Sequence, residues 1–264
     1  MDDYFTFAKG LVYEVGNTIS RKRFTFSNEV KRSRSPDTII DSWIAQHIKE
    51  RFEARTGILV YSESYDDPQK RISGDTFAWL DPIDGTRSLT HEESTYSISL
   101  GLIRRGRLLW GVVYQPHVAE RRLYSALRNQ GVFRSIADRP ERRIKVSSGD
   151  KLRGILGNTF SGATTEIFHS NDVETVGPVG GFVYKVTMVA DGRGEGYVKP
   201  GDKCNEWDSL AAQIILEEAG GRITDRYGRP LQYNKENPRH EYGIVASNGK
   251  THDVFLELCD MISK

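Results

Sequence analysis

The chain has 264 residues, of which 38% are hydrophobic and 28% are charged, a composition typical of a folded globular protein rather than a disordered or fibrous one. Lys and Arg number 37 and Asp and Glu number 36, so the formal net charge is +1. This balance excludes a general electrostatic attraction to nucleic-acid polymers or acidic membranes, so an anionic ligand must be bound by a local site.

The two cysteines, Cys204 and Cys259, do not form a CxxC pair. We therefore expect neither a disulfide framework nor a structural zinc site. Residues 1–4 are acidic and lack the basic and apolar segments of a signal peptide. No apolar stretch approaches the roughly 20 residues that span a bilayer. Together these features predict a cytoplasmic protein without a membrane span.

In chain order, residues 4–20 carry apolar side chains at helical spacing, and the basic segment 21–34 is predicted to be a solvated loop or a strand pair. A helix is predicted from Pro36, in its first turn, to Gly57 at its end. Further on, the N-terminal half is predicted to contain several strands. These are short strands at 58–61 and 77–80, followed by an antiparallel meander over 96–133.

The charged segment 138–145 is the best boundary candidate, and it divides the chain into halves 1–145 and 146–264. In the second half, strands alternate with helices. The strands are predicted at 154–157, 196–198, 222–225 and 243–246, and the helices at 183–190, 207–219 and 252–262. This alternation, together with the meander, predicts an α+β protein of stacked layers rather than one doubly wound sheet.

The most informative segment is a predicted strand that leads into Asp81-Pro82-Ile83-Asp84. Pro82 fixes its own φ and holds Asp81 extended, so the chain is expected to turn sharply at the end of the strand. Such a turn can bring both carboxylates and the Ile83 carbonyl to one point. Carboxylates this close repel each other unless a proton or cation lies between them, and hard oxygen ligands suit Mg²⁺ or Mn²⁺.

Gly85 and Thr86 follow directly. Glycine permits close backbone approach, and N–H groups gathered here would bind an anion, so a phosphate could contact the metals and these amides together. The alternative for Asp-x-x-Asp-Gly is a capped turn. The apolar strand and the proline favour the metal site.

Three further carboxylates occupy suggestive positions. Glu63 follows a strand-like run, Asp208 lies in the first turn of a predicted helix, and Asp41 lies among apolar neighbours where a polar group needs a partner. Taken alone, Glu63 would be a surface residue, and Asp208 would serve the helix dipole. The complete set and its order are what indicate a shared site.

These segments resemble the inositol monophosphatase superfamily of lithium-sensitive, magnesium-dependent phosphatases. The similarity covers roughly residues 35–250 and includes two signatures of that superfamily. The matching elements are Asp81-Pro82-Ile83-Asp84-Gly85-Thr86, Trp207-Asp208 with Glu218-Ala219-Gly220-Gly221, Glu63, and Thr38-x-x-Asp41. The resemblance implies a layered αβαβα sandwich of the inositol monophosphatase and fructose-1,6-bisphosphatase type. Most metal ligands would come from the first half, and Asp208 and the substrate contacts from the second.

The resemblance also implies the roles of particular residues. Roughly two or three Mg²⁺ ions, or Mn²⁺ in their place, would be held by several oxygen donors. The implied donors are Glu63, Asp81, the Ile83 carbonyl, Asp84 and Asp208. Asp41 and Thr86 would position and deprotonate the attacking water. Ser64 stands where the family often has a second acidic residue, which predicts a weaker third metal site.

The C-terminal half is most similar to the 3'(2'),5'-bisphosphate nucleotidase (CysQ-like) branch, through segments 205–208 and 228–233. The implied substrate contacts are Gly85, Thr86, Arg87, Gly181, Lys185 and Asp208. Lys185 would meet the second phosphate of a nucleotide; the alternative is a helix-surface lysine.

Two observations leave the substrate open. Gly201 stands where inositol-phosphate members carry a glutamate, which disfavours inositol phosphate. Segment 158–162 lacks the Arg-Ser-His element usual in the nucleotidases, so a sugar bisphosphate or another small phosphomonoester is also compatible.

The resulting hypothesis is a Mg²⁺-dependent phosphomonoesterase that removes the 3'-phosphate of 3'-phosphoadenosine 5'-phosphate by metal-activated water. The alternatives within the superfamily are an inositol 1-phosphate or sugar (bis)phosphate phosphatase. The distant alternatives are a non-catalytic metal-binding protein and a nucleic-acid-binding module using segment 21–34. The presence of Asp41 and Thr86 argues against the first of these, and the near-zero net charge argues against the second. The expected partner is a small phosphorylated metabolite, and the sequence leaves open whether the chain forms a homodimer.

Overall fold

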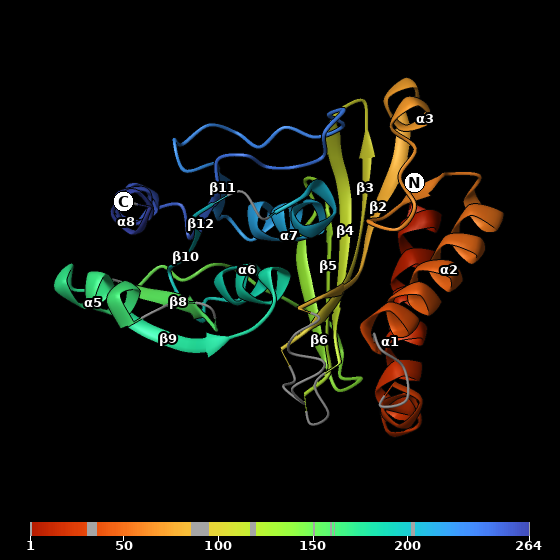
Figure 1. Ribbon diagram of the computed structural model, residues 1–264, viewed down its shortest axis with the longest axis horizontal. Helices are drawn as coiled ribbons and strands as arrows, with labels where there is room; N and C mark the ends of the chain where they lie inside the picture. The colour runs from red at the N-terminus through yellow and green to blue at the C-terminus, as the bar shows by residue number, and fades with distance from the viewer. Residues whose placement is uncertain are drawn as a thin grey trace.

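Two β-sheets and the helices between and outside them form five layers in the computed structural model (Figure 1). The structure describes residues 2–30, 36–85, 95–116, 120–149, 151–158, 160, 162–201 and 204–263. In order, the layers are α1 with α2, a seven-stranded sheet, α6 with α7, a five-stranded sheet, and α5 with α8. The predicted αβαβα sandwich is confirmed.

The first sheet is a meander in which the strands follow one another in chain order. Its strands are β1 Val60–Tyr61, β2 Thr76–Asp84, β3 Ser97–Arg104, β4 Arg107–Gln115, β5 Arg122–Leu127, β6 Gly131–Ile136 and β7 Arg142–Arg143. β1 pairs with β2 in parallel, and every later pair is antiparallel. The meander predicted over 96–133 is therefore correct, and the sheet continues beyond it with β1 and β2 on one side and β7 on the other.

Two long helices, α1 (Asp2–Val30) and α2 (Pro36–Thr56), cover the outer face of this sheet. The predicted loop or strand pair over 21–34 is wrong for residues 21–30, because α1 continues through them. Arg and Lys are good helix formers, so a basic segment does not end a helix by itself. α2 ends at Thr56 and is followed by Gly57, whose φ of 68° is the left-handed conformation that glycine adopts most easily.

The second sheet has the order β11-β12-β10-β8-β9 and mixes parallel and antiparallel pairs. Its strands are β8 Arg153–Gly157, β9 Glu174–Val179, β10 Gly196–Lys199, β11 Arg222–Thr224 and β12 Ile244–Ser247. The remaining helices are α3 Pro68–Ser73, α5 Gly162–Ser170, α6 Phe182–Ala190, α7 Glu206–Glu218 and α8 His252–Ile262. α3, α5 and β9 were not predicted from the sequence, because each is short or weakly patterned.

The largest buried cluster lies between the two sheets and joins both halves of the chain. It contains Trp79 and Val113 from the first sheet, Ile214 from α7, and Ile155 and Ala246 from the second sheet. The division at residue 145 coincides with the change of sheet, but the two sides share this core, and the proposed domain division stays a prediction. Cys204 and Cys259 are free cysteines, and both are buried. Within the described ranges, every helix is too short or too polar to cross a bilayer.

Burial of His252 at the start of α8 makes the stability of the C-terminal layers depend on pH. Its imidazole is hydrogen-bonded to Thr224 and Ser247, and burial, followed by the Arg222 charge, lowers its pKa to about 4. The unfolded chain takes up a proton below about pH 6.5, whereas the folded protein does so only near pH 4. Stability should therefore fall as the pH falls through this window.

We expect His252→Gln to lose part of this pH dependence. Between pH 7 and pH 5 the wild-type free energy of unfolding should fall by about 1 kcal/mol more than that of the variant. Urea denaturation at both pH values measures the difference, and His169→Gln, which removes an exposed imidazole, is the matched control. An equal pH dependence in wild type and His252→Gln would contradict the assignment.

Candidate active site

Asp81 and Asp84 lie within β2 rather than in a turn after it. The pairing with β3 continues to Asp84, with a bulge between Asp81 and Asp84, and the chain turns at Gly85, whose φ is 89°. The predicted sharp turn at the aspartates is therefore wrong. A bulge accommodates Pro82 without ending the strand, and it turns the carboxylates toward a common side. The Ile83 N–H donates to Asp81 Oδ1 at 3.1 Å.

The carboxylate of Asp84 caps the N-terminus of α6. Its oxygens accept from the N–H of Phe182 at 2.7 Å and of Val183 at 2.8 Å. A Cβ at Gly181 would lie 2.5 Å from Asp84 Oδ2, and Gly181 has φ 61°, so only glycine fits here. The predicted substrate residue Gly181 thus lies directly beside the predicted metal ligand Asp84.

Lys185 is buried in α6, so the alternative of a helix-surface lysine is wrong. Its Nζ lies 5.1 Å from the centre of the Tyr197 ring. Burial lowers the pKa of Lys185 to about 8, against the opposing effect of the Asp84 charge. The ammonium therefore lies within electrostatic range of the Asp84 carboxylate, and its contact with a substrate phosphate stays a prediction.

Asp208 lies in the first turn of α7, where its Oδ2 accepts from the N–H of Asn205 at 2.6 Å. Close packing on two glycines sets the position of this helix. A Cβ at Gly101 would lie 3.2 Å from Ala211 N, and one at Gly111 would lie 2.8 Å from Ala211 O. Burial raises the pKa of Asp208 to about 7, and the charges of Asp84 and Glu63 add to the rise.

Glu63 and Asp41 complete the acidic group. Glu63 is exposed in the turn that follows β1, closed by mutual backbone hydrogen bonds between Ser62 and Tyr65, and Asp41 lies in α2. Burial raises the pKa of Asp81 well above its ordinary value, and the charges of four other carboxylates raise it further. In decreasing order of effect these are Asp208, Asp84, Asp41 and Glu63. Tertiary structure thus brings five acidic side chains from four segments within electrostatic range of one another.

The chemistry of this group fits hard divalent cations. Buried carboxylates that repel one another require compensating positive charge. Ser97 and Ser99 stand opposite Asp84 and Asp81 on β3, and their buried hydroxyls have no hydrogen-bond partner among the described residues. Cross-strand partners share a face of the sheet, so these hydroxyls could bond to the water shell of a cation bound by the aspartates.

The carboxylates do not surround a single point as they stand. Within the part of the chain that the structure describes, no three His, Cys, Asp or Glu side chains are placed to hold one ion. Asp84 and Asp208 bond instead to backbone N–H groups. A bound cation would draw these oxygens away from their backbone partners. Thr86 and Arg87 lie outside the described residues, so their predicted roles stay predictions.

Sequence reasoning missed Ser97 and Ser99. The signal was available, since Tyr96-Ser97-Ile98-Ser99-Leu100 alternates and therefore places both serines on one face of β3. Their position opposite the two aspartates depended on the strand register, which the sequence did not specify.

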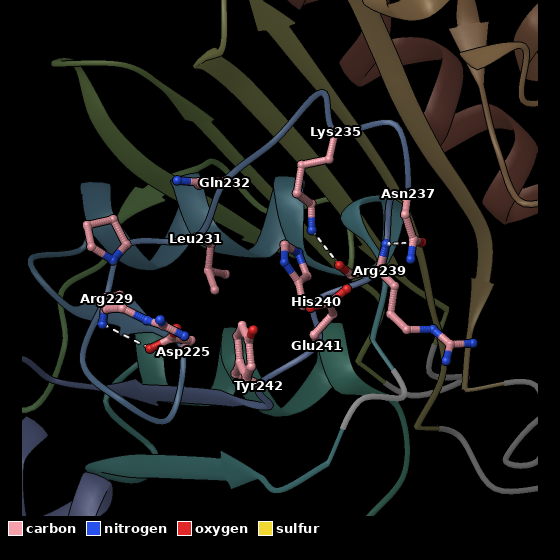
Figure 2. A pocket seen from close by; sticks show the side chains of 11 residues that line it. Asp225, Arg229, Leu231, Gln232, Lys235, Asn237, Arg239, His240, Glu241 and Tyr242 are labelled. Atoms are coloured by element: carbon pink, nitrogen blue, oxygen red, sulfur yellow. Dashed lines mark hydrogen bonds and ion pairs between the residues drawn. The ribbon is translucent and has the colours of Figure 1, made fainter.

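A separate cavity of about 380 Å³ lies beside the loop that joins β11 to β12 (Figure 2). Figure 2 shows Arg229 and Lys235 approaching it from opposite sides. Arg229 pairs with Asp225 at 2.6 Å and stacks on Tyr242. None of the predicted metal ligands lines this cavity. One of its lining residues, His240, is hydrogen-bonded through Nε2 to Ser209 Oγ at 2.7 Å. Ser209 follows Asp208 in the sequence.

Comparison with known proteins finds similarity to one protein family along nearly the whole chain. The profile of the inositol monophosphatase family matches residues 1–263. Inositol monophosphatase 2 of Homo sapiens is 29% identical over 250 residues, covering 87% of this chain and 83% of the relative. The 3'(2'),5'-bisphosphate nucleotidase CysQ of Haemophilus influenzae is 27% identical over 214 residues, covering 78% of each chain.

Solved structures give the same fold. The crystal structure of CysQ from Bacteroides thetaiotaomicron superposes with a TM-score of 0.73 at 22% identity, covering 93% of this chain and 98% of the other. At this identity the likeness is one of fold, and the order of layers described above is that of the family.

We expect the acidic group to destabilise the protein when no divalent cation is bound. Asp81→Asn should then raise the unfolding temperature by about 2–4 °C, because it removes one buried charge from the group. Adding about 5 mM MgCl₂ should raise the unfolding temperature of the wild type but not of the variant. Thermal denaturation followed by circular dichroism measures both effects.

The matched control is Asp75→Asn, which removes an exposed carboxylate paired with Arg105. It should respond to Mg²⁺ as the wild type does. If neither Mg²⁺ nor Mn²⁺ changed the unfolding temperature of the wild type, the metal site would be refuted.

Proposed function

Because the chain belongs to the inositol monophosphatase family, we propose that it is a Mg²⁺-dependent phosphomonoesterase acting on a small nucleoside bisphosphate such as 3'-phosphoadenosine 5'-phosphate. The observation that carries the proposal is that Asp81 and four other carboxylates, from four separate segments, lie within electrostatic range of one another. This group lies beside the N-terminus of α6, where N–H groups and the helix dipole favour an anion.

In this proposal Asp81, Asp84, Asp208, Glu63 and the Ile83 carbonyl hold the cations. When bound, the cations neutralise the charge of the phosphate and of the leaving oxygen. Asp41 accepts a proton from the attacking water, and Thr86 orients that water. The carboxylates bind and position, and Asp41 moves the proton, so most of the catalysis by the chain itself is electrostatic and geometric.

The choice of a bisphosphate rests on the neighbourhood of Lys185. A buried ammonium beside Asp84 adds positive charge next to the metal site, where a second phosphate would gain most from it. CysQ relatives, named as bisphosphate nucleotidases, support this choice. Gly201 lies seven residues before Asp208, where the family resemblance implies a glutamate in the inositol branch.

A second candidate is an inositol 1-phosphate phosphatase. It is favoured by the 29% identity to inositol monophosphatase 2 over most of this chain. The two candidates use the same metal ligands and differ only in what surrounds the leaving group.

Phosphate release in the presence of Mg²⁺ tests both candidates. The assay compares 3'-phosphoadenosine 5'-phosphate, inositol 1-phosphate and fructose 1,6-bisphosphate, and we expect the largest kcat/KM for the first. A preference for inositol 1-phosphate would replace the nucleotide assignment by the second candidate. No release from any of the three with Mg²⁺ or Mn²⁺ would overturn the enzymatic proposal.

Asp84→Asn should lower kcat by about 10³-fold or more, equivalent to about 4 kcal/mol, because an amide lacks the negative charge with which Asp84 would hold the cations. Asp75→Asn is the control, since it makes the same chemical change at an exposed position. Near-normal turnover of Asp84→Asn at saturating Mg²⁺ would contradict its role as a ligand.

Lys185→Met should raise KM for 3'-phosphoadenosine 5'-phosphate about tenfold, because it removes the ammonium but keeps the length of the side chain. For the corresponding 3'-monophosphate, which lacks the second phosphate, KM should change by less than about twofold. Steady-state kinetics on the two substrates measures the ratio. Equal changes for both substrates would remove Lys185 from the specificity argument.

A further inference from the structure

A fully buried guanidinium, that of Arg71 in α3, fastens two segments of the chain together. Its Nε and Nη2 donate to the two carboxylate oxygens of Asp66, at 2.8 and 3.1 Å. Its Nη1 donates to the Lys235 carbonyl at 2.9 Å and to Asn234 Oδ1 at 3.2 Å. One side of the guanidinium therefore holds the segment after Glu63, and the other side holds the loop between β11 and β12.

The same loop is held from its other side by a buried carboxylate. Glu206, the first residue of α7, accepts from the N–H of Asn234 at 2.7 Å and of Lys235 at 2.9 Å. It also accepts from Trp79 Nε1 at 3.0 Å, and the Arg71 guanidinium lies over the Trp79 ring at 5.0 Å. Arg71, Trp79 and Glu206 thus form one buried network that encloses residues 234–235.

Each part of this network lies next to a proposed metal ligand in the sequence. Asp66 is three residues after Glu63, Trp79 is two residues before Asp81, and Glu206 is two residues before Asp208. Glu63 lies on an exposed turn, so its position relative to α7 depends on what anchors that turn. The anchor in the structure is the fork between Arg71 and Asp66.

We propose that Arg71 is a positioning residue that holds the Glu63 turn against the first turn of α7 and thereby sets the cation affinity of the site. The inference rests on the proposed function, because it takes Glu63 and Asp208 as ligands. Arg71 acts through Asp66 on one side and through residues 234–235 and Glu206 on the other. Partners that orient metal ligands in this way typically change metal affinity by about 10- to 100-fold when they are mutated.

Only an arginine fits this role. The surroundings of Arg71 present the two oxygens of one carboxylate on one side and amide and carbonyl oxygens on the other. A planar guanidinium can donate hydrogen bonds to both sides at once. A lysine would keep the charge but could not fork. Arg71→Lys therefore separates positioning from simple charge compensation.

The experiment measures Mn²⁺ binding to the full chain by isothermal titration calorimetry, and in parallel the Mg²⁺ concentration that gives half-maximal phosphate release. We expect Arg71→Lys to weaken Mn²⁺ binding at least tenfold and to raise the half-maximal Mg²⁺ concentration similarly. At saturating Mg²⁺ its kcat should stay within about threefold of wild type. Arg105→Gln, which breaks an exposed pair with Asp75, is the control and should leave both quantities unchanged.

A second variant guards against misfolding of the first. Asp66→Asn keeps Arg71 in place but weakens its hold on the Glu63 turn, and Asp66 is partly exposed, so the variant should fold. It should weaken Mn²⁺ binding in the same direction. A wild-type Mn²⁺ affinity in a folded Arg71→Lys or Asp66→Asn protein would overturn the inference and leave the proposed function intact. If the wild type bound neither Mn²⁺ nor Mg²⁺, the proposed function would fail, and this inference with it.

Discussion

Mutual repulsion between the buried Asp81 and the carboxylates around it is the constraint on which the structure of the site depends. Burial and the charges of Asp208, Asp84, Asp41 and Glu63 all raise the pKa of Asp81, so the fold assembles a group that is unfavourable without added positive charge. Without a cation, part of that charge is met by backbone N–H groups at the first turns of α6 and α7. In the proposed function, divalent cations would supply the remaining positive charge.

The layers of the fold supply these compensating groups from the interior of the molecule. α6 and α7 lie between the two sheets. The N-terminus of α6 bonds to Asp84 at the end of β2, and Glu206 at the N-terminus of α7 bonds to Trp79 within β2. Gly101 and Gly111 let the backbone of α7 approach β3 and β4 closely, and Gly181 lets α6 approach Asp84. A side chain at any of these glycines would push a helix away from the carboxylates, so the conformation and size of the glycines bear directly on the site.

The proposed substrate preference depends on a different balance of charge. Lys185 is buried against an aromatic ring beside Asp84, where its ammonium adds a fixed positive charge to a site that otherwise relies on bound cations. The network of Arg71, Trp79 and Glu206 is a separate device, since it bonds the loop after β11 to the turn that carries Glu63. Lys185 would thus influence which phosphate ester is bound. The network of Arg71, Trp79 and Glu206 would influence how tightly the cations are held.

By itself, the sequence determined the types of elements and the chemistry of the ligands. Alternation over 96–133 determined the meander, Pro36 and Gly57 marked the ends of α2, and Asp81-Pro82-Ile83-Asp84 pointed to an acidic site. These features are local, because side-chain period, backbone preference and donor type are properties of short segments. α1 extends through residues 21–30, because the helix propensity of Lys and Arg outweighs their charge as an indication of loop.

Only the tertiary structure decided where these local features meet. Strand register determines the bulge in β2 and the cross-strand position of Ser97 and Ser99 opposite the two aspartates. The packing of α3, α6 and α7 determines the burial of Lys185 and of Arg71. Such contacts join residues up to 165 positions apart. A contact between residues so far apart in the sequence forms only when the core forms, because its free energy depends on the packing of several layers of the fold. No single segment of the sequence specifies that packing.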